Sequence, residues 1–370
     1  MKRGGIFFLL LFFGLLAGFK ASERQQIRVL LGDFSPPVLI SGKGLKISSG
    51  VRKATIYTGK IQVLVKKDEL LIKEKRYSLP VRVKGSGVIS LGEGTYRGEL
   101  KLFAWQGKVR VVNILRVEDY LAGVIKNEMN PSWPLEALKA QAVLARTYAL
   151  HKIKNPRSRE FDLYADVRDQ VYQGVRAEDE RAWKAINQTR GEVLFYQRNL
   201  AEVFYHSCCG GRTEAVEYVW GGQGKPYLIS VACGYCQECP YYFWRYPEQG
   251  VIGSRELADA LGYNGEEVEQ IELVEKSPSG RVLKLRVRFK AGFEVIISGN
   301  DFRTRLGRDF VRSTLFRIEP EAGGWVIFGS GSGHGVGLCQ WGARGMAEQG
   351  KNYQEILRYY FPGTRIRKAY

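Results

Sequence analysis

The sequence is poor in histidine, with three residues, and it has no internal repeat, no low-complexity linker and no dense run of basic residues. Beyond one short segment near its N-terminus, it also lacks a long hydrophobic run. A membrane-spanning helix needs about 20 apolar residues, and a nucleic-acid-binding protein usually carries a clustered basic patch or a recognisable reading module. These absences argue against a multi-spanning membrane protein and against a nucleic-acid partner.

The N-terminus has the layout of a secretory signal peptide, predicted over residues 1–22. Two basic residues precede an apolar run over residues 6–19, and the small residues Ala21 and Ser22 follow. An uncleaved signal anchor is the alternative, because Lys20 is a poor neighbour for a cleavage site. No cysteine lies there to carry a lipid. We therefore expect an exported protein in the periplasm, the cell wall or on the outer face of the cytoplasmic membrane.

The charge is the main positive feature of the composition. Lysine and arginine number 56 against 38 acidic residues, which gives a formal net charge of +18. A basic exported protein is attracted to anionic surfaces, such as cell-wall polymers or lipid headgroups. The alternative is that these residues, which are spread evenly, only solvate the surface. Apolar residues make up 45% of the chain, which is enough for a buried core.

Short strand-like segments dominate the chain. Residues 27–112 contain runs rich in β-branched residues, such as IRVLLG and GKVRVVNIL, bounded by glycine, serine, proline and lysine. The period becomes helical over residues 117–151, and strand patterns return at about 191–222 and 271–328. A final helix is expected over residues 353–360, ahead of a proline-glycine stop.

These patterns predict an α+β fold that is mostly β. We expect a β-rich N-terminal domain over residues 23–113. A mixed catalytic domain is expected over residues 114–370, with helices around a cleft. Within it, residues 264–330 are expected to form a β-hairpin insertion.

The first helical segment, about residues 117–129, carries an apolar stripe through Leu121 and Val124, and the stripe leads to Glu128. A glutamate in a last turn lies at the negative end of the helix macrodipole, and burial acts in the same direction, so its pKa is expected to rise. A carboxylic acid that stays protonated near neutral pH suits general acid catalysis. The alternative is a surface ion pair with Lys126 or an arginine.

A second helix is expected to begin near Pro134, which suits a first turn. Its small residues, among them Ala142 and Ala145, form a packing stripe. Arg146 lies on this helix and is expected to contact either substrate or the Glu128 carboxylate. Pairing with Glu128 would lower the pKa of that carboxylate.

Five of the six cysteines gather in two short segments, with Cys208 next to Cys209 and a later C-x2-C-x2-C run. Disulfides are the alternative in an exported protein, but three cysteines at two-residue gaps suit a metal site better. Neighbours on a strand point to opposite faces, so the adjacent pair cannot easily both ligate. We predict a closed, structural zinc site. Its ligands are drawn from His206, Cys209, Cys233, Cys236 and Cys239.

The segment GHGVGLCQWGA, residues 333–343, places a histidine, a glutamine and a tryptophan among glycines that do not suit a packed core. Glycine at this density is typical of backbone that turns sharply or approaches a ligand. His334 is therefore expected at a cleft, with a hydrogen-bonded structural histidine as the alternative. Cys339 is expected to be a small buried residue.

Several segments together resemble the stage II sporulation protein D family. The likeness covers about residue 114 to the C-terminus, roughly two thirds of the chain. The segments occur in order, and five of them are NEMNPSWPLEALKAQA, DQVYQGV, TRGEVL, FYHSCCGGRTEAVEYVWGG and GHGVGLCQWGARGMAEQG.

The resemblance implies a peptidoglycan lytic transglycosylase in which Glu128 is the catalytic carboxylate, first as acid and then as base. It also implies zinc at the cysteine-rich positions and no organic cofactor. The motif residues expected to contact glycan are Arg146, Tyr172, His334 and Gln340. The sporulation name does not carry over, because nothing in the sequence shows the cellular process.

Two other functions stay open. Some relatives are regarded as non-catalytic enhancers of a cell-wall amidase, an N-acetylmuramoyl-L-alanine amidase. A hydrolase acting with water would need a second carboxylate near Glu128, and Glu118 and Asp119, about two turns away, are not placed convincingly. The expected partners are peptidoglycan glycan strands and, for the first alternative, an amidase. Contact with a membrane is expected only through an uncleaved N-terminal segment.

Overall fold

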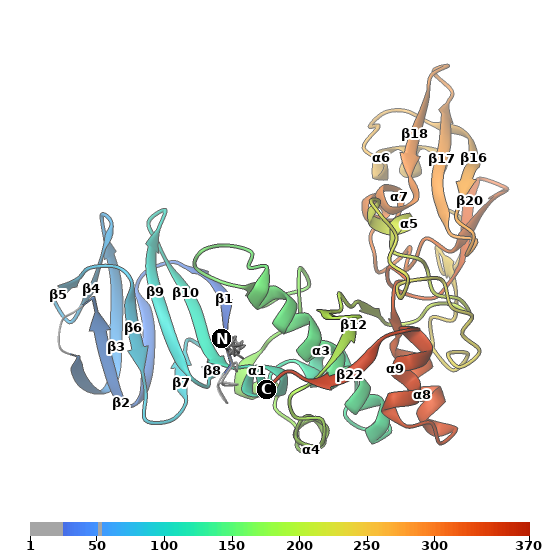
Figure 1. Cartoon of the computed structure of the whole chain (residues 1–370). Coiled ribbons are helices and arrows are strands. Elements are labelled where there is room, and N and C mark those ends of the chain that lie inside the picture. The colour runs from blue at the N-terminus through green and yellow to red at the C-terminus, as the bar shows by residue number, and fades with distance from the viewer. Residues whose placement is uncertain (1–24, 51–53) are drawn as a thin grey trace, which may run out of the picture.

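The structure is a computed structural model that describes residues 25–50 and 54–370. The predicted signal peptide, residues 1–22, lies outside the described residues. Within the described part, no helix is long and apolar enough to cross a membrane. The fold is mixed α+β and mostly β, which confirms the predicted class. Figure 1 shows a large sheet at one end, helices in the middle and a smaller β-rich part at the other end.

The N-terminal sheet follows from alternating apolar and charged residues. In the strand Val81–Lys84 the two valines are buried and Arg82 is exposed, the two-residue period of a strand with one face on a core. The sheet has its own apolar core. Its strands are β1 (Gln26–Phe34), β2 (Val38–Ser49), β3 (Thr55–Lys66), β4 (Glu69–Ile72), β5 (Lys75–Tyr77), β6 (Val81–Lys84), β7 (Ile89–Leu91), β8 (Gly94–Tyr96), β9 (Glu99–Trp105), β10 (Lys108–Arg116) and β11 (Leu163–Tyr164). Their order is β11-β1-β10-β9-β6-β2-β3-β4-β5, with β7 paired to β2 and β8 to β7.

The middle of the chain is built around one long helix, α3 (Leu135–Lys154). Pro134 caps its N-terminus, which confirms the predicted start, and its small residues Ala142 and Ala145 are fully buried. The other helices are α1 (Val117–Ala122), α2 (Ile125–Glu128), α4 (Glu180–Gln188), α5 (Glu217–Trp220), α6 (Ser254–Ala260), α7 (Gly299–Leu306), α8 (Gln340–Glu348) and α9 (Tyr353–Tyr360), with a 3-10 turn at Gly174–Ala177. Helices α4, α8 and α9 pack on α3.

The segment predicted as one helix over residues 117–129 is two short helices, α1 and α2. The chain turns at Gly123, which caps α1. A Cβ added to Gly123 would lie 2.5 Å from the ring of Tyr172, so the ring occupies the space that a side chain would need. The prediction of one helix is therefore wrong, although Glu128 does end a helix.

Arg146 is fully buried on α3 and pairs with Glu118 of α1, with 2.8 Å between Nη2 and Oε2. Its Nη1 also donates to the Glu192 carbonyl at 3.0 Å. A guanidinium enclosed in this way offers no surface to a ligand. The expected contact of Arg146 with substrate or with Glu128 is therefore wrong, and the residue instead joins α1, α3 and the strand that begins at Glu192.

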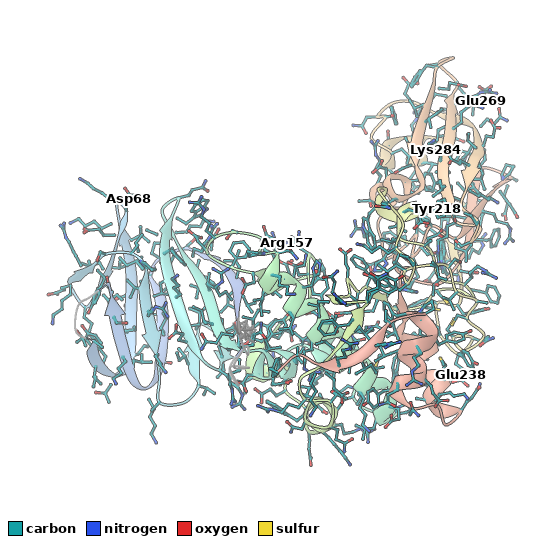
Figure 2. The ribbon with its side chains drawn as sticks, viewed as in Figure 1. Asp68, Arg157, Tyr218, Glu238, Glu269 and Lys284 are labelled. Atoms are coloured by element: carbon teal, nitrogen blue, oxygen red, sulfur yellow. The ribbon has the colours of Figure 1, made fainter. Side chains whose placement is uncertain are left out.

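The C-terminal β-rich part has its own apolar core, which extends from Trp244 to Ile327 and so includes residues ahead of the predicted start of the insertion at 264. Its strands are β15 (Phe243–Tyr246), β16 (Val268–Lys276), β17 (Val282–Phe289), β18 (Glu294–Ser298), β19 (Phe316–Glu321) and β20 (Gly324–Ser330). They form two sheets, β15-β20-β19 and β16-β17-β18. Tyr218 of α5, labelled in Figure 2, lies at the base of this part and lines a cavity of about 180 Å³ with Arg303 of α7.

Two small sheets fasten the C-terminal segment to the middle of the chain. In the first, β12 (Glu192–Tyr196) pairs with β13 (Asn199–Leu200) and with β22 (Arg365–Lys368). In the second, β14 (Tyr205–His206) pairs in parallel with β21 (Leu338–Cys339).

Replacing Glu118 with alanine should lower the free energy of unfolding by about 3–5 kcal/mol, because the Arg146 charge stays buried without its partner. Urea unfolding of the wild type and the variant measures this change. Glu99→Ala is the matched control: its pair with Arg82 lies at the surface, so its loss should not exceed about 1 kcal/mol. Equal losses in the two variants would contradict the assigned importance of the buried pair.

Candidate functional site

Two segments that are distant in the sequence meet at the short pair of β14 and β21. His206 pairs with Cys339, which brings the histidine-cysteine segment beside the glycine-rich loop, and α8 begins directly afterwards at Gln340. Gly337 permits this approach. Its φ is 71°, and an added Cβ would lie 2.2 Å from the Phe204 carbonyl oxygen. This glycine therefore serves close contact between two backbone segments.

Glu128 lies half-buried at the end of α2. Its Oε1 accepts a hydrogen bond from the Val171 N–H at 3.0 Å, and its carbonyl accepts one from Gln340 Nε2 at 2.8 Å. Burial, the largest cause, raises the pKa of Glu128 above its ordinary value of 4.5, whereas hydrogen bonds from the Val171 N–H and the Tyr205 hydroxyl act to lower it. Among the described residues, no ion pair joins Glu128 to Lys126 or to an arginine, so the structure contradicts the surface-pair alternative.

Polar side chains connect Glu128 to the interior. The Tyr205 hydroxyl, which acts to lower the pKa of Glu128, accepts a hydrogen bond from Gln170 Nε2 at 3.0 Å. The Tyr120 hydroxyl donates to Gln170 Oε1 at 3.0 Å. Sequence reasoning did not single out Gln170 or Tyr205. Both lie inside the motifs DQVYQGV and FYHSCC, so the resemblance held the only signal that could have found them.

The other acidic residues on α1 and on the loop before Val171 are engaged in ion pairs. Three of these carboxylates lie 2.7–2.8 Å from arginine nitrogens. The pairs are Glu118 with Arg146, Asp119 with Arg116 and Asp169 with Arg157. None of these three carboxylates is left free for catalysis.

Tyr172 and Gln340 occupy structural positions. Tyr172 is buried, and its hydroxyl donates to Asn113 Oδ1 at 2.8 Å, which contradicts a direct contact with glycan. Gln340 is 7% exposed and reaches from the Glu128 carbonyl to Gln141 Oε1 at 3.3 Å. Gln340 is thus brought to Glu128, where it acts as a positioning residue.

His334 uses both ring nitrogens within the protein. Its Nε2 donates to the Tyr205 carbonyl and its Nδ1 accepts from the Val336 N–H, both at 3.0 Å, which is the pattern of a neutral imidazole. Burial lowers the pKa of His334 to about 4, and nearby Arg281 acts in the same direction. This arrangement fits the hydrogen-bonded structural histidine that was the alternative. Trp220, 51% exposed, lies 5.0 Å from the imidazole between ring centroids.

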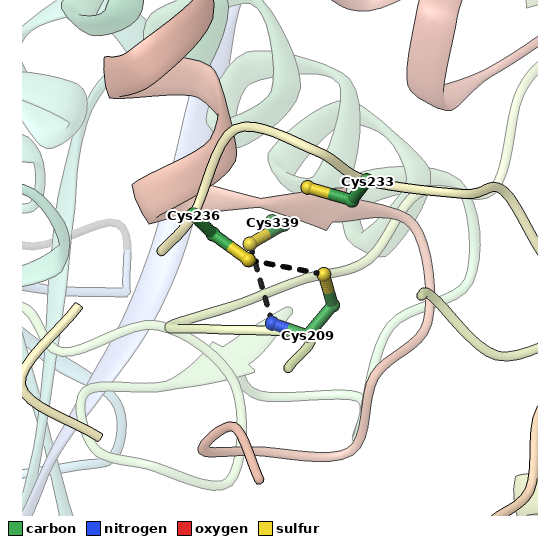
Figure 3. A group of neighbouring side chains, drawn as sticks. All are labelled: Cys209, Cys233, Cys236 and Cys339. Carbon is green, nitrogen blue, oxygen red and sulfur yellow. Dashed lines mark hydrogen bonds between the residues drawn. The ribbon is translucent and has the colours of Figure 1, made fainter. Parts of the chain in front are cut away.

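Four cysteine thiols gather in one group, as Figure 3 shows, and one of them, Cys339, lies on β21. Their sulfur atoms all lie within 4.8 Å of one another, and the group can hold a metal ion. The four residues are Cys209, Cys233, Cys236 and Cys339. All six cysteines are free and buried.

This cluster corrects the predicted ligand set. His206 lies outside it, with Nδ1 3.2 Å from the Val336 carbonyl, and Cys239 lies outside it as well. Cys339, expected only as a small buried residue, takes the remaining place. Its spacing could not reveal this, because Cys339 follows Cys236 by roughly a hundred residues and joins the group only through the pairing of β14 with β21.

The surroundings of the thiols suit a bound cation. The Cys339 sulfur accepts hydrogen bonds from the N–H groups of Cys209 at 3.2 Å and Gly342 at 3.3 Å. The Tyr360 hydroxyl lies 3.1 Å from the Cys233 sulfur. Such donors stabilise thiolates, the form that binds metal. A Cβ on Gly342 would lie 2.0 Å from the Tyr360 hydroxyl, so this close packing requires glycine.

An aromatic surface lies at the start of α8. Trp133, which closely follows Glu128 in the chain, meets Trp341 edge to face with 4.9 Å between ring centroids. Arg344 lies over the Trp341 ring at 4.8 Å. Both tryptophans are partly exposed, and tryptophan combines a large apolar face with one polar group.

Comparison with known proteins identifies the family. A family model described as stage II sporulation protein matches residues 105–196, which include Glu128. A second model, described as a domain of unknown function (DUF8618), matches residues 237–337, most of the C-terminal β-rich part. An uncharacterized protein of Brachyspira hyodysenteriae is 34% identical over 359 residues, or 93% of this chain and 94% of that protein. The chain belongs to the stage II sporulation protein D family.

Two Bacillus subtilis proteins are more distant relatives. Stage II sporulation protein D is 28% identical over 275 residues, which cover 70% of this chain and 76% of that protein. The amidase enhancer is 28% identical over 296 residues, which cover 66% of this chain but only 40% of the enhancer. The family therefore includes proteins named for sporulation and for the enhancement of an amidase.

Cys339→Ser should lose most of the metal bound by the purified wild type, because it removes one of the four clustered thiols. Cys239→Ser should keep it, because this thiol lies outside the cluster. Elemental analysis of the two purified variants against the wild type measures the difference. Loss of metal from Cys239→Ser alone would restore the sequence-based ligand set and refute the structural one.

Proposed function

We propose that the protein is an exported peptidoglycan lytic transglycosylase. It would cleave the glycan strand between N-acetylmuramic acid and N-acetylglucosamine and leave a 1,6-anhydro-muramyl end. The observation that carries the proposal is Glu128, a half-buried carboxyl with a raised pKa and no cationic partner in the part of the chain that the structure describes. It lies inside the segment that the family model matches. A carboxyl of this kind can act as a general acid near neutral pH. Family membership supports the substrate class.

Glu128 serves both chemical steps. In the first, its proton passes to the glycosidic oxygen, the bond from that oxygen to the muramic acid anomeric carbon breaks, and the leaving sugar departs with a new hydroxyl. In the second, the Glu128 carboxylate takes the proton of the muramic acid 6-hydroxyl while that oxygen bonds to the anomeric carbon. Glu128 ends protonated, and no water is consumed. The Val171 N–H and the Tyr205 hydroxyl stabilise the carboxylate between the steps.

The surrounding acids favour this route over hydrolysis. An ordinary glycosidase uses two carboxyl groups, of which the second activates water or attacks the sugar. Glu118 and Asp119 of α1 and Asp169 of the loop before Val171 are each bonded to an arginine. Attack by the hydroxyl of the substrate itself needs no second acid.

The tryptophan surface supports a glycan substrate. Trp133 and Trp341 offer partly exposed ring faces, and Gln340, which precedes Trp341, bonds to the Glu128 carbonyl. We assign the two tryptophans to sugar binding beside the catalytic carboxyl. The net charge of +18 adds a general attraction to an anionic wall polymer.

Zinc fits the cysteine cluster. Zinc takes four thiolates in tetrahedral geometry with about 2.3 Å between metal and sulfur, and a site with four protein ligands has no open position. The four buried thiols supply this donor set, and their hydrogen-bond donors suit thiolates. Zinc would therefore act as a structural clamp between three segments, and every catalytic step would belong to Glu128.

The amidase-enhancer function is the second candidate. Its support is the Bacillus subtilis amidase enhancer, which matches 66% of this chain at 28% identity. In that case the glycan surface would bind the wall without cleaving it, and a cell-wall amidase would be the partner. Export by a signal peptide at residues 1–22 is proposed for both functions, as is the division into residues 23–113 and 114–370.

The decisive experiment is mass spectrometry of peptidoglycan, intact and amidase-stripped, after incubation with the wild type, Glu128→Gln or Glu180→Gln. Glu180 is an exposed glutamate on α4 and provides the matched control. We expect anhydro-muramyl products from the wild type and Glu180→Gln and a loss of at least about 100-fold in Glu128→Gln, the lower range for a general acid. Products with reducing ends would indicate a hydrolase, and wall binding without any cleavage would indicate the enhancer.

The pH dependence follows from the raised pKa of Glu128. The first step needs the protonated carboxyl, so the cleavage rate should fall as pH rises through the folded-state pKa, which lies above 4.5. The same shift affects stability: the neutral carboxyl is favoured in the fold, and this contribution is lost as pH rises through that value. Glu128→Gln should therefore show no loss of stability at neutral pH. A cleavage rate still rising above pH 9 would contradict the acid role.

A further inference from the structure

Arg281 is a buried charge that the proposed chemistry leaves unused. It lies just before β17, at the base of the C-terminal β-rich part, and is 1% exposed. Its Nη2 donates to the Cys209 carbonyl at 2.7 Å and to the Arg212 carbonyl at 3.1 Å. Within residues 25–50 and 54–370, Nε and Nη1 have no hydrogen-bond partner. A buried guanidinium is unfavourable unless negative charge nearby compensates it.

Acidic side chains compensate this charge only in part. Among the residues that the structure describes, no carboxylate oxygen forms an ion pair with Arg281, that is, none lies within 4.0 Å of one of its nitrogens. Glu214 is the acid that acts most on Arg281, but its Oε1 accepts from the Ala215 N–H and its Oε2 from the Ser279 hydroxyl. The other groups that act on Arg281 are cysteine side chains, with Cys209 first among them, and these carry a negative charge only as thiolates.

A metal centre with four thiolates would supply the negative charge that is needed to compensate the Arg281 guanidinium. Four thiolates and one divalent cation carry a net charge of −2, and this charge is buried as well. Cys209 connects the two groups directly, since its sulfur belongs to the cluster and its carbonyl holds the guanidinium. The positive and the negative group therefore lie next to each other in a part of the protein closed to solvent.

The glycine-rich loop is shaped around this guanidinium. A Cβ added to Gly335 would lie 2.7 Å from Arg281 Nε and 2.8 Å from its Cζ, so Gly335 covers one face of the planar group. The loop continues into Cys339 of the cluster. Arg281, the loop and the thiols thus form one packed unit at the junction of the C-terminal β-rich part and the core.

We infer that Arg281 is the counter-charge of the metal centre and that bound metal thereby fastens the C-terminal β-rich part to the core. Arg281 is a positioning residue in this assignment and touches neither substrate nor metal. The inference rests on the proposed metal site and is independent of the proposed glycan cleavage.

The inference predicts that Arg281→Met lowers the melting temperature more with zinc bound than without it. With zinc bound, methionine leaves the dianionic centre uncompensated. Without zinc, no dianionic metal centre is present, so the loss should be smaller or the melting temperature should rise. A residue that only bonds to the Cys209 and Arg212 carbonyls would lower the melting temperature equally in both states.

The test combines zinc affinity with thermal unfolding of the full chain. Competition against a chromophoric chelator should show the dissociation constant for zinc rising by about 10–100-fold in Arg281→Met, the usual range for residues that support metal ligands. Arg303→Met is the matched control. Arg281 and Arg303 both line the cavity of about 180 Å³ at the base of the C-terminal β-rich part. The Nε of Arg303 donates to the Val311 carbonyl and its side chain is not bonded to a cluster residue, so zinc affinity should be unchanged.

Arg281→Lys keeps the positive charge and provides a second test if Arg281→Met does not fold. If Arg281→Met folds, Arg281→Lys should bind zinc more tightly than Arg281→Met. If Arg281→Met does not fold, the dissociation constant of Arg281→Lys for zinc should lie within about tenfold of the wild-type value. Equal zinc affinity in Arg281→Met and the wild type, or destabilisation of both metal states alike, would overturn the assignment while leaving the zinc site in place. A wild type that binds no zinc would overturn both. These experiments do not measure cleavage of peptidoglycan, so a failure of the proposed cleavage activity would be detected independently of them.

Discussion

Four thiols from three distant segments meet in one buried cluster, and the position of the candidate site depends on that meeting. Cys339 belongs to the cluster and also caps α8, so the sulfur atoms determine where α8 begins. Gln340, the first residue of α8, then reaches the Glu128 carbonyl. The loops around the cluster have little regular secondary structure. A metal ion that binds four thiolates can hold such loops, because its binding free energy becomes folding free energy.

Glu118 and Glu128 show how the same fold gives two glutamates different chemistry. Glu118 is bonded to Arg146 and accepts further hydrogen bonds from the Gly191 N–H and the Tyr370 hydroxyl, so it is committed to structure. Glu128 is only half-buried and has no cationic partner among the described residues. Burial then dominates and raises its pKa. A carboxyl needs this combination of partial access and partial desolvation to hold a proton and still deliver it to a substrate.

Two buried arginines also differ in how their charge is compensated. Arg146 is neutralised by a carboxylate within the core, whereas Arg281 is held by backbone carbonyls beside the thiol cluster. The first arrangement joins helices of one core, and the second joins the core to a part of the chain that a separate family model matches. The β-rich C-terminal part has its own apolar core, so its attachment depends on a few contacts at the junction. A charge-dependent contact is well suited to that task.

The sequence by itself determined the fold class and the start of α3 and singled out Glu128 as a candidate acid, because these depend on local periods, caps and motifs read over neighbouring residues. It could not reveal the break at Gly123, since the ring that fills that space belongs to Tyr172. It also could not reveal that Arg146 is internal or that Cys339 replaces His206 and Cys239 in the cluster. Those facts depend on contacts between residues far apart in the chain. Only the tertiary structure decides them, because strand pairing and burial bring together groups whose spacing in the sequence carries no signal.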